Sequence, residues 1–134
     1  MTKKEDLQKK LIEFQILDAN FKMLQERAEI LNKKLEELQK TGVAIEELKT
    51  TKPEKALIPL GSGNFVYGEI ENCDEIIVGV GNGVAIKKKR EEALKNLDSR
   101  IKEIEKDMND IIKQSSAFVI QLEKVQQEIE KLQK

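Results

Sequence analysis

The chain has 134 residues, of which 37% are charged and 4% aromatic, and it contains no His and one Cys. It has too few large side chains to fill a compact globular core, and its Lys, Glu, Leu, Ile and Gln are typical of long helices and coiled coils. The absence of His excludes a Ser-His-Asp triad and imidazole metal ligands, and a single Cys builds neither an intrachain disulfide nor a thiolate metal site. We therefore expect a protein that is not an enzyme and that uses no cofactor or metal.

The charge balance indicates which classes of partner the chain binds. Lys and Arg number 24 and Asp and Glu number 25, so the net charge is -1, whereas nucleic-acid-binding proteins usually carry a clear basic excess. No apolar run approaches the ~20 residues of a membrane span, and residues 1–10 are too polar for a signal peptide. We expect a cytoplasmic protein that binds neither nucleic acid nor membrane, and the richness in Lys and Glu favours a thermophilic source.

The first predicted element is a helix over residues 4–50. Thr2 and Glu5 form a T-x-x-E capping box at its start, and Pro53 ends it because the residue before a proline avoids the helical region. Apart from one irregular step at Phe14, its apolar residues alternate between spacings of three and four, which is typical of a coiled-coil seam. The seam residues are Leu7, Leu11, Phe14, Leu17, Phe21, Leu24, Ala28, Leu31, Leu35, Leu38, Gly42 and Ile45.

Residues 56–88 change to strand periodicity and predict two β-hairpins, separated by a polar turn over residues 71–74. The first hairpin turns at Gly61–Asn64 and the second at Gly81–Gly83, while Gly68 and Gly79 within the strands suit bends or close backbone approach. Four short strands have open edges and no layer to pack on, so we expect another subunit to complete the sheet. The residues assigned to assembly are Ile58, Phe65, Val66, Ile76, Val78, Val84 and Ile86.

A second helix is predicted over residues 90–133. Its seam residues are Leu94, Leu97, Ile101, Ile104, Met108, Ile111, Ser115, Phe118, Leu122, Val125, Ile129 and Leu132. An antiparallel pairing with the first helix sets Leu35 level with Ile104 and Leu31 level with Met108; the alternative is that each helix pairs with another molecule. The expected fold is mainly α: one domain over residues 1–134, built as a long antiparallel coiled-coil hairpin with two short β-hairpins at the turn end that oligomerise into a β-barrel or sheet.

Two motifs stand in the strand segment. Residues 58–68 read IPLGSGNFVYG, and residues 77–83 read IVGVGNG and precede Glu91-Glu92-Ala93. They resemble the two hairpins and the helix entry of prefoldin α-class subunits, whose first hairpin has the form I-P-L-G-x-G-x-F-x-x-G. The resemblance implies an ATP-independent holding chaperone of the prefoldin type, which assembles through its hairpins and binds unfolded client proteins near the coiled-coil tips. It also implies β-class prefoldin subunits and a chaperonin as further partners.

Within this family, Val84 and residues 85–87 depart from the usual α-class pattern. The departures favour a resemblance to the filament-forming archaeal gamma-prefoldin, which self-assembles through its hairpins. The expected function is therefore a holdase that forms homo-oligomers or filaments. Two alternatives stay open: a structural filament-forming coiled-coil protein, and an α subunit of a hetero-hexameric prefoldin.

Apolar residues outside the seam gather in the helix halves that lie far from the strands along the chain. Exposed apolar surface on a soluble protein commonly marks an interaction site, although a widened seam or contact with a neighbouring coil would have the same pattern. The candidate client-binding residues are Leu7, Leu11, Ile12, Ile16, Val119 and Ile120.

Three further motifs have simpler explanations. Gly79–Gly83 lacks the G-x-G-x-x-G spacing before a helix that dinucleotide binding requires, and it fits a hairpin turn. The basic run Lys87–Arg90 is followed at once by two Glu residues, which favours a solvated strand-to-helix junction. Cys73 lies in a polar turn without a partner thiol, so we interpret it as an incidental free Cys.

Overall fold

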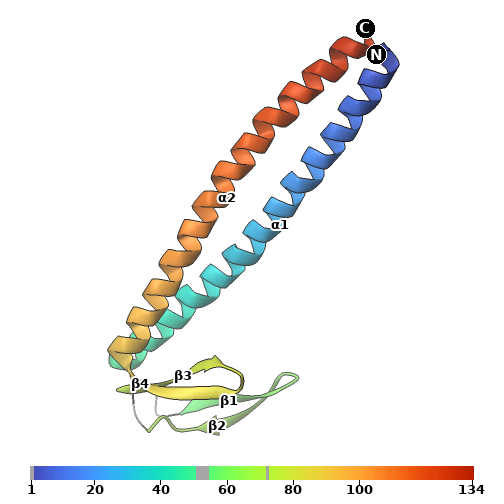
Figure 1. Cartoon of the computed structure of the whole chain (residues 1–134). Coiled ribbons are helices and arrows are strands. Elements are labelled where there is room, and N and C mark those ends of the chain that lie inside the picture. The colour runs from blue at the N-terminus through green and yellow to red at the C-terminus, as the bar shows by residue number, and fades with distance from the viewer. Residues whose placement is uncertain (1, 51–54, 72) are drawn as a thin grey trace. The chain divides into compact units, whose positions relative to one another are not determined.

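The structure is a computed structural model that describes residues 2–50, 55–71 and 73–134. The elements follow the order α1 (Lys3–Thr50), β1 (Ala56–Gly61), β2 (Asn64–Gly68), β3 (Glu75–Gly81), β4 (Val84–Lys89) and α2 (Arg90–Gln133) (Figure 1). The predicted fold of two long helices and two hairpins is confirmed. The predicted helix stop at Thr51–Pro53 and residue Asn72 of the predicted turn lie outside the described residues.

The chain divides into two compact units. We call Met1–Leu35 with Glu103–Lys134 the helical unit, and Glu36–Lys102, which contains all four strands, the strand unit. Each unit contains a part of both helices. The assignment of residues 1–134 to a single domain stays a prediction.

The start of α1 follows the capping signal in the sequence. The Glu5 amide donates a hydrogen bond of 3.2 Å to Thr2 Oγ1, and the Asp6 amide donates one of 3.2 Å to the Thr2 carbonyl. The bond to Thr2 Oγ1 satisfies an amide that has no backbone partner in the first turn, and the bond to the Thr2 carbonyl is the first regular backbone bond of the helix. Glu5 and Asp6 also place negative charge at the positive end of the helix dipole.

The two helices run antiparallel within the helical unit (Figure 1). Lys10 Nζ lies 2.5 Å from Glu128 Oε2, and Lys3 Nζ donates to the carbonyl of Lys134, so both ends of the chain meet at one end of this unit. The hydrogen bond to Glu128, and then the one to Glu13, raises the pKa of Lys10, while the hydrogen bond from Lys10 lowers the pKa of Glu128. Lys10 lies 25 residues before Leu35, and Glu128 lies 24 residues after Ile104, so the ion pair agrees with the predicted antiparallel register.

The coiled-coil core is the predicted seam. The apolar residues that are buried in the helices are Leu38, Ile45, Ala93, Ile104, Ile111 and Val125, and all of them except Ala93 are predicted seam residues. The remaining seam residues are half-buried, with one exception: Leu11, next to the irregular step at Phe14, is 41% exposed. The prediction that Leu11 lies in the seam is therefore wrong in this structure, because the step of three rotates this position away from the partner helix.

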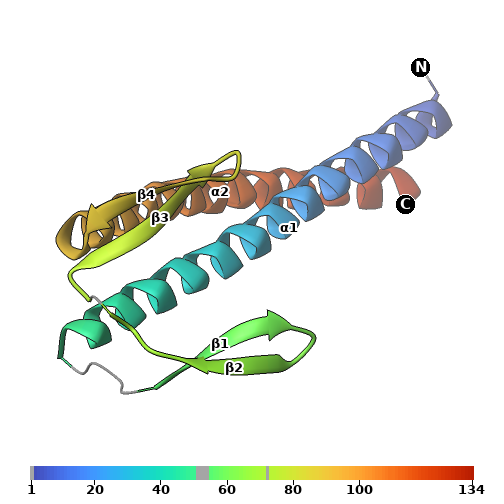
Figure 2. The ribbon, with the colours of Figure 1, turned by 90° about the horizontal axis from the view of Figure 1, so that it is seen from below.

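The strands form two separate antiparallel hairpins, β1–β2 and β3–β4 (Figure 2). The register pairs Ile58 with Val66 in the first hairpin and Val78 with Ile86 in the second. Each ladder shifts one residue before its turn, between Pro59 and Gly61 and between Gly79 and Gly81. The two hairpins therefore share one design, with a bulge followed by a two-residue turn.

The turns explain two of the motifs. Ser62 and Gly63 have φ of 52° and 80°, and Asn82 and Gly83 have φ of 53° and 73°, which are the left-handed values of type I′ turns. The prediction of close approach holds for Gly68, where an added Cβ would overlap Ile58 Cδ1. At Gly79 an added Cβ would have no neighbour within 4 Å, and the irregularity of the ladder between Gly79 and Gly81 fits the predicted bend instead.

The junction between β4 and α2 differs from the sequence interpretation. Arg90 is only 8% exposed, and its Nη1 donates a hydrogen bond of 2.7 Å to the Cys73 carbonyl. Its amide donates to the Asp74 carbonyl at 2.8 Å, and its guanidinium lies 3.6 Å from Asp74 and 3.5 Å from Glu91. The basic run is therefore not a wholly solvated junction, because its last member fastens the chain before β3 to the start of α2.

Candidate functional site

The described residues offer several exposed apolar surfaces that could bind a partner. Within this part of the chain, no three His, Cys, Asp or Glu residues gather to hold a metal ion. Neither helix, over the residues described, is long and apolar enough to cross a membrane.

The β1–β2 hairpin presents apolar side chains on both faces. Cross-strand pairing places Leu57 beside Tyr67 and Pro59 beside Phe65 on one face, and Ile58 beside Val66 on the other. All six side chains are exposed, and the bulge residue Leu60 is 70% exposed. A two-stranded ribbon that is apolar on both sides is marginally stable alone, so it needs a further layer.

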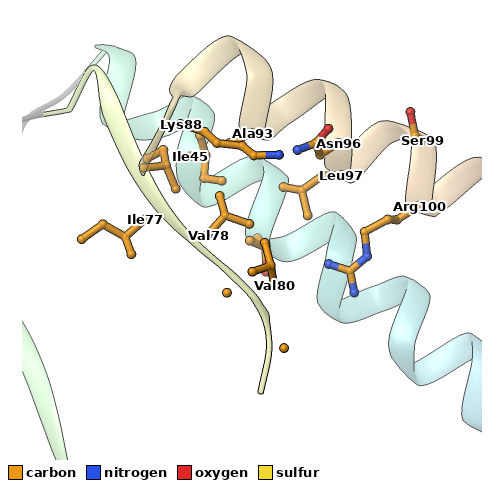
Figure 3. A pocket seen from close by; sticks show the side chains of 14 residues that line it. Ile45, Ile77, Val78, Val80, Lys88, Ala93, Asn96, Leu97, Ser99 and Arg100 are labelled. Atoms are coloured by element: carbon orange, nitrogen blue, oxygen red, sulfur yellow. The ribbon is translucent and has the colours of Figure 1, made fainter. Parts of the chain in front are cut away.

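The β3–β4 hairpin differs, because one of its faces lies toward helix residues of the same strand unit. Ile76 and Val78 are half-buried, whereas Ile77 between them is exposed. Figure 3 shows Val78 and Val80 on the side of β3 that faces α2, and Ile77 on the opposite side. Alternation along the strand therefore separates an inward face from an outward face.

A groove of about 790 Å³ lies between β3 and the helices of the strand unit (Figure 3). Its apolar lining includes Ile45, Val78, Val80, Ala93 and Leu97. Its charged lining residues are Lys88 and Arg100, and no carboxylate contributes to it. We call it the β3 groove.

The predicted assembly residues occupy both hairpins but play different parts. Ile58, Phe65 and Val66 on the first hairpin are exposed, and so are Val84 and Ile86 on β4. Ile76 and Val78 instead line the β3 groove. The sequence selection missed exposed apolar strand residues, although the strand alternation could have found them: Leu57, Leu60, Tyr67, Ile77 and Val80.

The predicted client-binding residues lie in the helical unit. Leu11, Ile12, Ile16, Val119 and Ile120 are exposed, whereas Leu7 is half-buried in the seam. Met23, Ile30 and Ile112 add exposed apolar side chains to the same unit and were not among the selected residues. The off-seam residues thus form an apolar surface that the pairing of the two helices leaves uncovered.

Known proteins match this chain over most of its length. The Prefoldin family, described as prefoldin subunit, matches residues 17–134. Prefoldin subunit alpha of Pyrococcus horikoshii is 34% identical over 122 residues, which cover 90% of this chain and 80% of the relative. Prefoldin subunit alpha of Archaeoglobus fulgidus is 29% identical over 132 residues, which cover 96% of this chain and 95% of the relative.

A solved structure agrees with the fold. The filamentous PFD from Methanocaldococcus jannaschii, determined by cryo-EM, superposes with a TM-score of 0.72 and 22% sequence identity, covering 83% of this chain and 93% of the other. At this identity the likeness is one of fold. The helix–hairpin–hairpin–helix order, the matched residues and the similarity to these relatives together show that the chain belongs to the prefoldin subunit family.

Proposed function

We propose that this chain is an ATP-independent holdase of the prefoldin type. It holds unfolded proteins on the apolar surface of the helical unit and shields them from aggregation. The observation that carries the proposal is the set of exposed aliphatic side chains outside the coiled-coil seam, since such surface on a soluble protein commonly marks an interaction site. Met23 suits a surface that binds many sequences because its side chain adapts its shape.

The proposed client site comprises Leu7, Leu11, Ile12, Ile16, Val119 and Ile120. Leu11 joins this surface directly because it is exposed, whereas Leu7 contributes only when the end of the seam opens. The proposed assembly residues are Ile58, Phe65, Val66, Ile76, Val78, Val84 and Ile86. Through them the chain forms homo-oligomers or filaments in the cytoplasm.

A matched pair of variants tests the client site. Ile16 and Ile120 are 57% and 67% exposed, while Val43, which belongs to the strand unit, is 58% exposed. Gln at Ile16 and Ile120 should weaken the suppression of aggregation of a chemically unfolded enzyme, followed by light scattering without nucleotide. The control is Gln at Val43 alone, compared with Gln at Ile16 alone: it removes a side chain of similar exposure and should have a smaller effect.

The suppression of aggregation is compared only among variants that assemble as the unaltered chain does. Sedimentation velocity establishes that assembly. A fourfold variant at Ile12, Ile16, Val119 and Ile120 extends the test. If it assembles and still suppresses aggregation as well as the unaltered chain, clients bind elsewhere.

Two other functions have support of their own. The structural neighbour is described as filamentous, which favours a protein whose main product is a filament. The relatives named prefoldin subunit alpha favour an α subunit, and for such a subunit the resemblance implies β-class partners and a chaperonin that receives clients. Electron microscopy of the purified chain separates these readings, because a filament former builds fibres alone and an α subunit needs a β-class partner.

A further inference from the structure

The β3 groove has the size and the apolar lining of a small-molecule site. Its apolar part is formed by Ile45, Ala93 and Leu97 of the helices together with Val78 and Val80 of β3. Its volume of about 790 Å³ lies within the range of about 300–1,000 Å³ that is usual for ligand pockets. Ile45 and Ala93 are buried, whereas Val80 is 52% exposed, so part of the apolar lining has no cover within its own chain.

The charged lining of the groove is wholly cationic. Lys88 of β4 and Arg100 of α2 contribute to it, and no Asp or Glu does. Neither of these two side chains forms an ion pair with another described residue. Asp98, which is adjacent to lining residues along α2, pairs with Lys102 at 3.1 Å and does not line the groove. In a chain with a net charge of -1, two cations therefore line one apolar groove without a carboxylate to balance them.

The two cations belong to different elements, and a further donor stands beside one of them. Figure 3 shows the Lys88 ammonium group directed toward Asn96, and the Arg100 guanidinium on the side of Val80. Lys88 is half-buried and Arg100 exposed, so their methylene stems extend the apolar lining while their charged groups reach water. An anionic group bound here would accept charge-assisted hydrogen bonds, which are about twice as strong as neutral ones.

This combination favours a ligand with an apolar body and one anionic head group. An uncharged ligand would cover Lys88 without supplying a counter-ion, and burying an unpaired charge is costly. A cationic ligand would be repelled by both charged side chains. A carboxylate matches the planar fork of the Arg100 guanidinium, and a hydrocarbon tail would take Val78, Val80 and Leu97 out of water.

We propose that the β3 groove binds a small amphipathic carboxylate, with its hydrocarbon tail along Val78, Val80 and Leu97 and its carboxylate at Lys88 and Arg100. The site is separate from the proposed client surface, which belongs to the helical unit. Both cations, Val80 and Leu97 are also absent from the proposed assembly residues. The inference therefore goes beyond the proposed function and does not depend on it.

Three ligands of equal chain length test the site on the unaltered full chain. Octanoate, 1-octanol and octylammonium share the length of their hydrocarbon chain and differ in the charge of the head group. Isothermal titration calorimetry should give the tightest binding for octanoate, weaker binding for octanol and the weakest for octylammonium. Hydrogen exchange followed by mass spectrometry should show that octanoate protects residues 76–81 of β3 and leaves the helical unit unchanged.

Matched substitutions separate the two parts of the site. Lys88→Gln with Arg100→Gln should weaken octanoate binding about tenfold or more, since each lost bond is a charged one, and should leave octanol binding unchanged. Lys87→Gln with Lys95→Gln removes the same charge at exposed residues outside the lining and should change neither. Val80→Ser should weaken the binding of both ligands.

Circular dichroism establishes that the variants keep the helix content of the unaltered chain. The comparison among the three ligands needs no substitution, so it still decides the inference if a variant fails to fold.

Each other outcome overturns the inference. If octanoate does not bind, or octylammonium binds as tightly, the groove is no site for a carboxylate. If octanoate protects the helical unit instead of β3, the ligand uses the client surface. If the control pair loses octanoate binding as much as the pair at Lys88 and Arg100, only the net charge attracts the anion.

Discussion

At the scale of single residues, two glycines differ in the space that surrounds them. Gly42 lies in the seam of α1, and an added Cβ there would have no neighbour within 4 Å. Gly68 lies in β2, where an added Cβ would overlap Ile58. The first glycine leaves space in the coiled coil, while the second makes room for a side chain of the partner strand.

We therefore expect Gly42→Ala to stabilise the chain by about 0.5–1 kcal/mol, because Gly within a helix costs that much relative to Ala. Urea unfolding followed by circular dichroism measures the change. Gly68→Ala is the comparison and should give no such gain, since Ile58 must move. A Gly42→Ala chain no more stable than the unaltered one would mean that the glycine is needed for helix packing.

For Arg90 we expect the opposite effect, a loss of stability on substitution. Arg90→Ala removes the hydrogen bond to the Cys73 carbonyl, and bonds to charged groups contribute about 1.5–3 kcal/mol. We expect a loss of stability within that range and faster amide hydrogen exchange in β3. Lys89→Ala, at the neighbouring exposed residue, is the control and should change neither.

At the scale of elements, the helices were predictable because a coiled-coil seam repeats over many turns. The buried residues Leu38, Ile104 and Ile111 all follow from that repeat. The turns were predictable too, because Asn82-Gly83 accepts the left-handed backbone that a type I′ turn requires.

The features that the sequence did not predict depend on contacts between segments far apart along the chain. Arg90 looks like one member of a basic run, and only the folded chain brings Cys73 against it. The β3 groove is lined by Val78 of β3 together with Leu97 and Ile45 of the two helices, and no local sequence pattern encodes that arrangement. For the same reason, the sequence did not reveal that Ile58 is exposed whereas Val78 lines the β3 groove.

The helix register gives a prediction at this scale. Cys at Leu35 and Ile104, in a Cys73→Ala chain, should cross-link within one chain, while Cys at Leu35 and Met108, about one turn away, should not. Gel electrophoresis without reductant shows whether each cysteine pair forms a cross-link. Cross-linking only between chains would contradict the register.

The burial of the seam residues predicts which truncation destabilises the chain more. Ile104 is buried and Leu31 half-buried. Ile104→Ala should therefore cost more than Leu31→Ala, with about 2–5 kcal/mol expected for a fully buried position.

At the scale of the whole molecule, the hairpins offer open edges and uncovered apolar faces. We expect the purified chain to assemble with itself at micromolar concentration without a second kind of subunit. Sedimentation velocity measures the mass, and electron microscopy distinguishes closed particles from filaments. A chain that enlarges only when a β-class subunit is added would support the hetero-hexameric function instead.

The contact between Lys3 and the carbonyl of Lys134 has a further consequence. It joins residues 131 apart along the chain, whereas each β-hairpin closes a short local loop within about 1–10 μs. We therefore expect the helices to pair from the strands outward and their free ends to close last and open first, since local opening begins where few contacts hold the chain. Leu7 and Leu132 should then spend part of their time unpaired, and we expect that fraction to grow on heating. The apolar surface exposed near the termini would thus increase with temperature, under the conditions in which other proteins unfold.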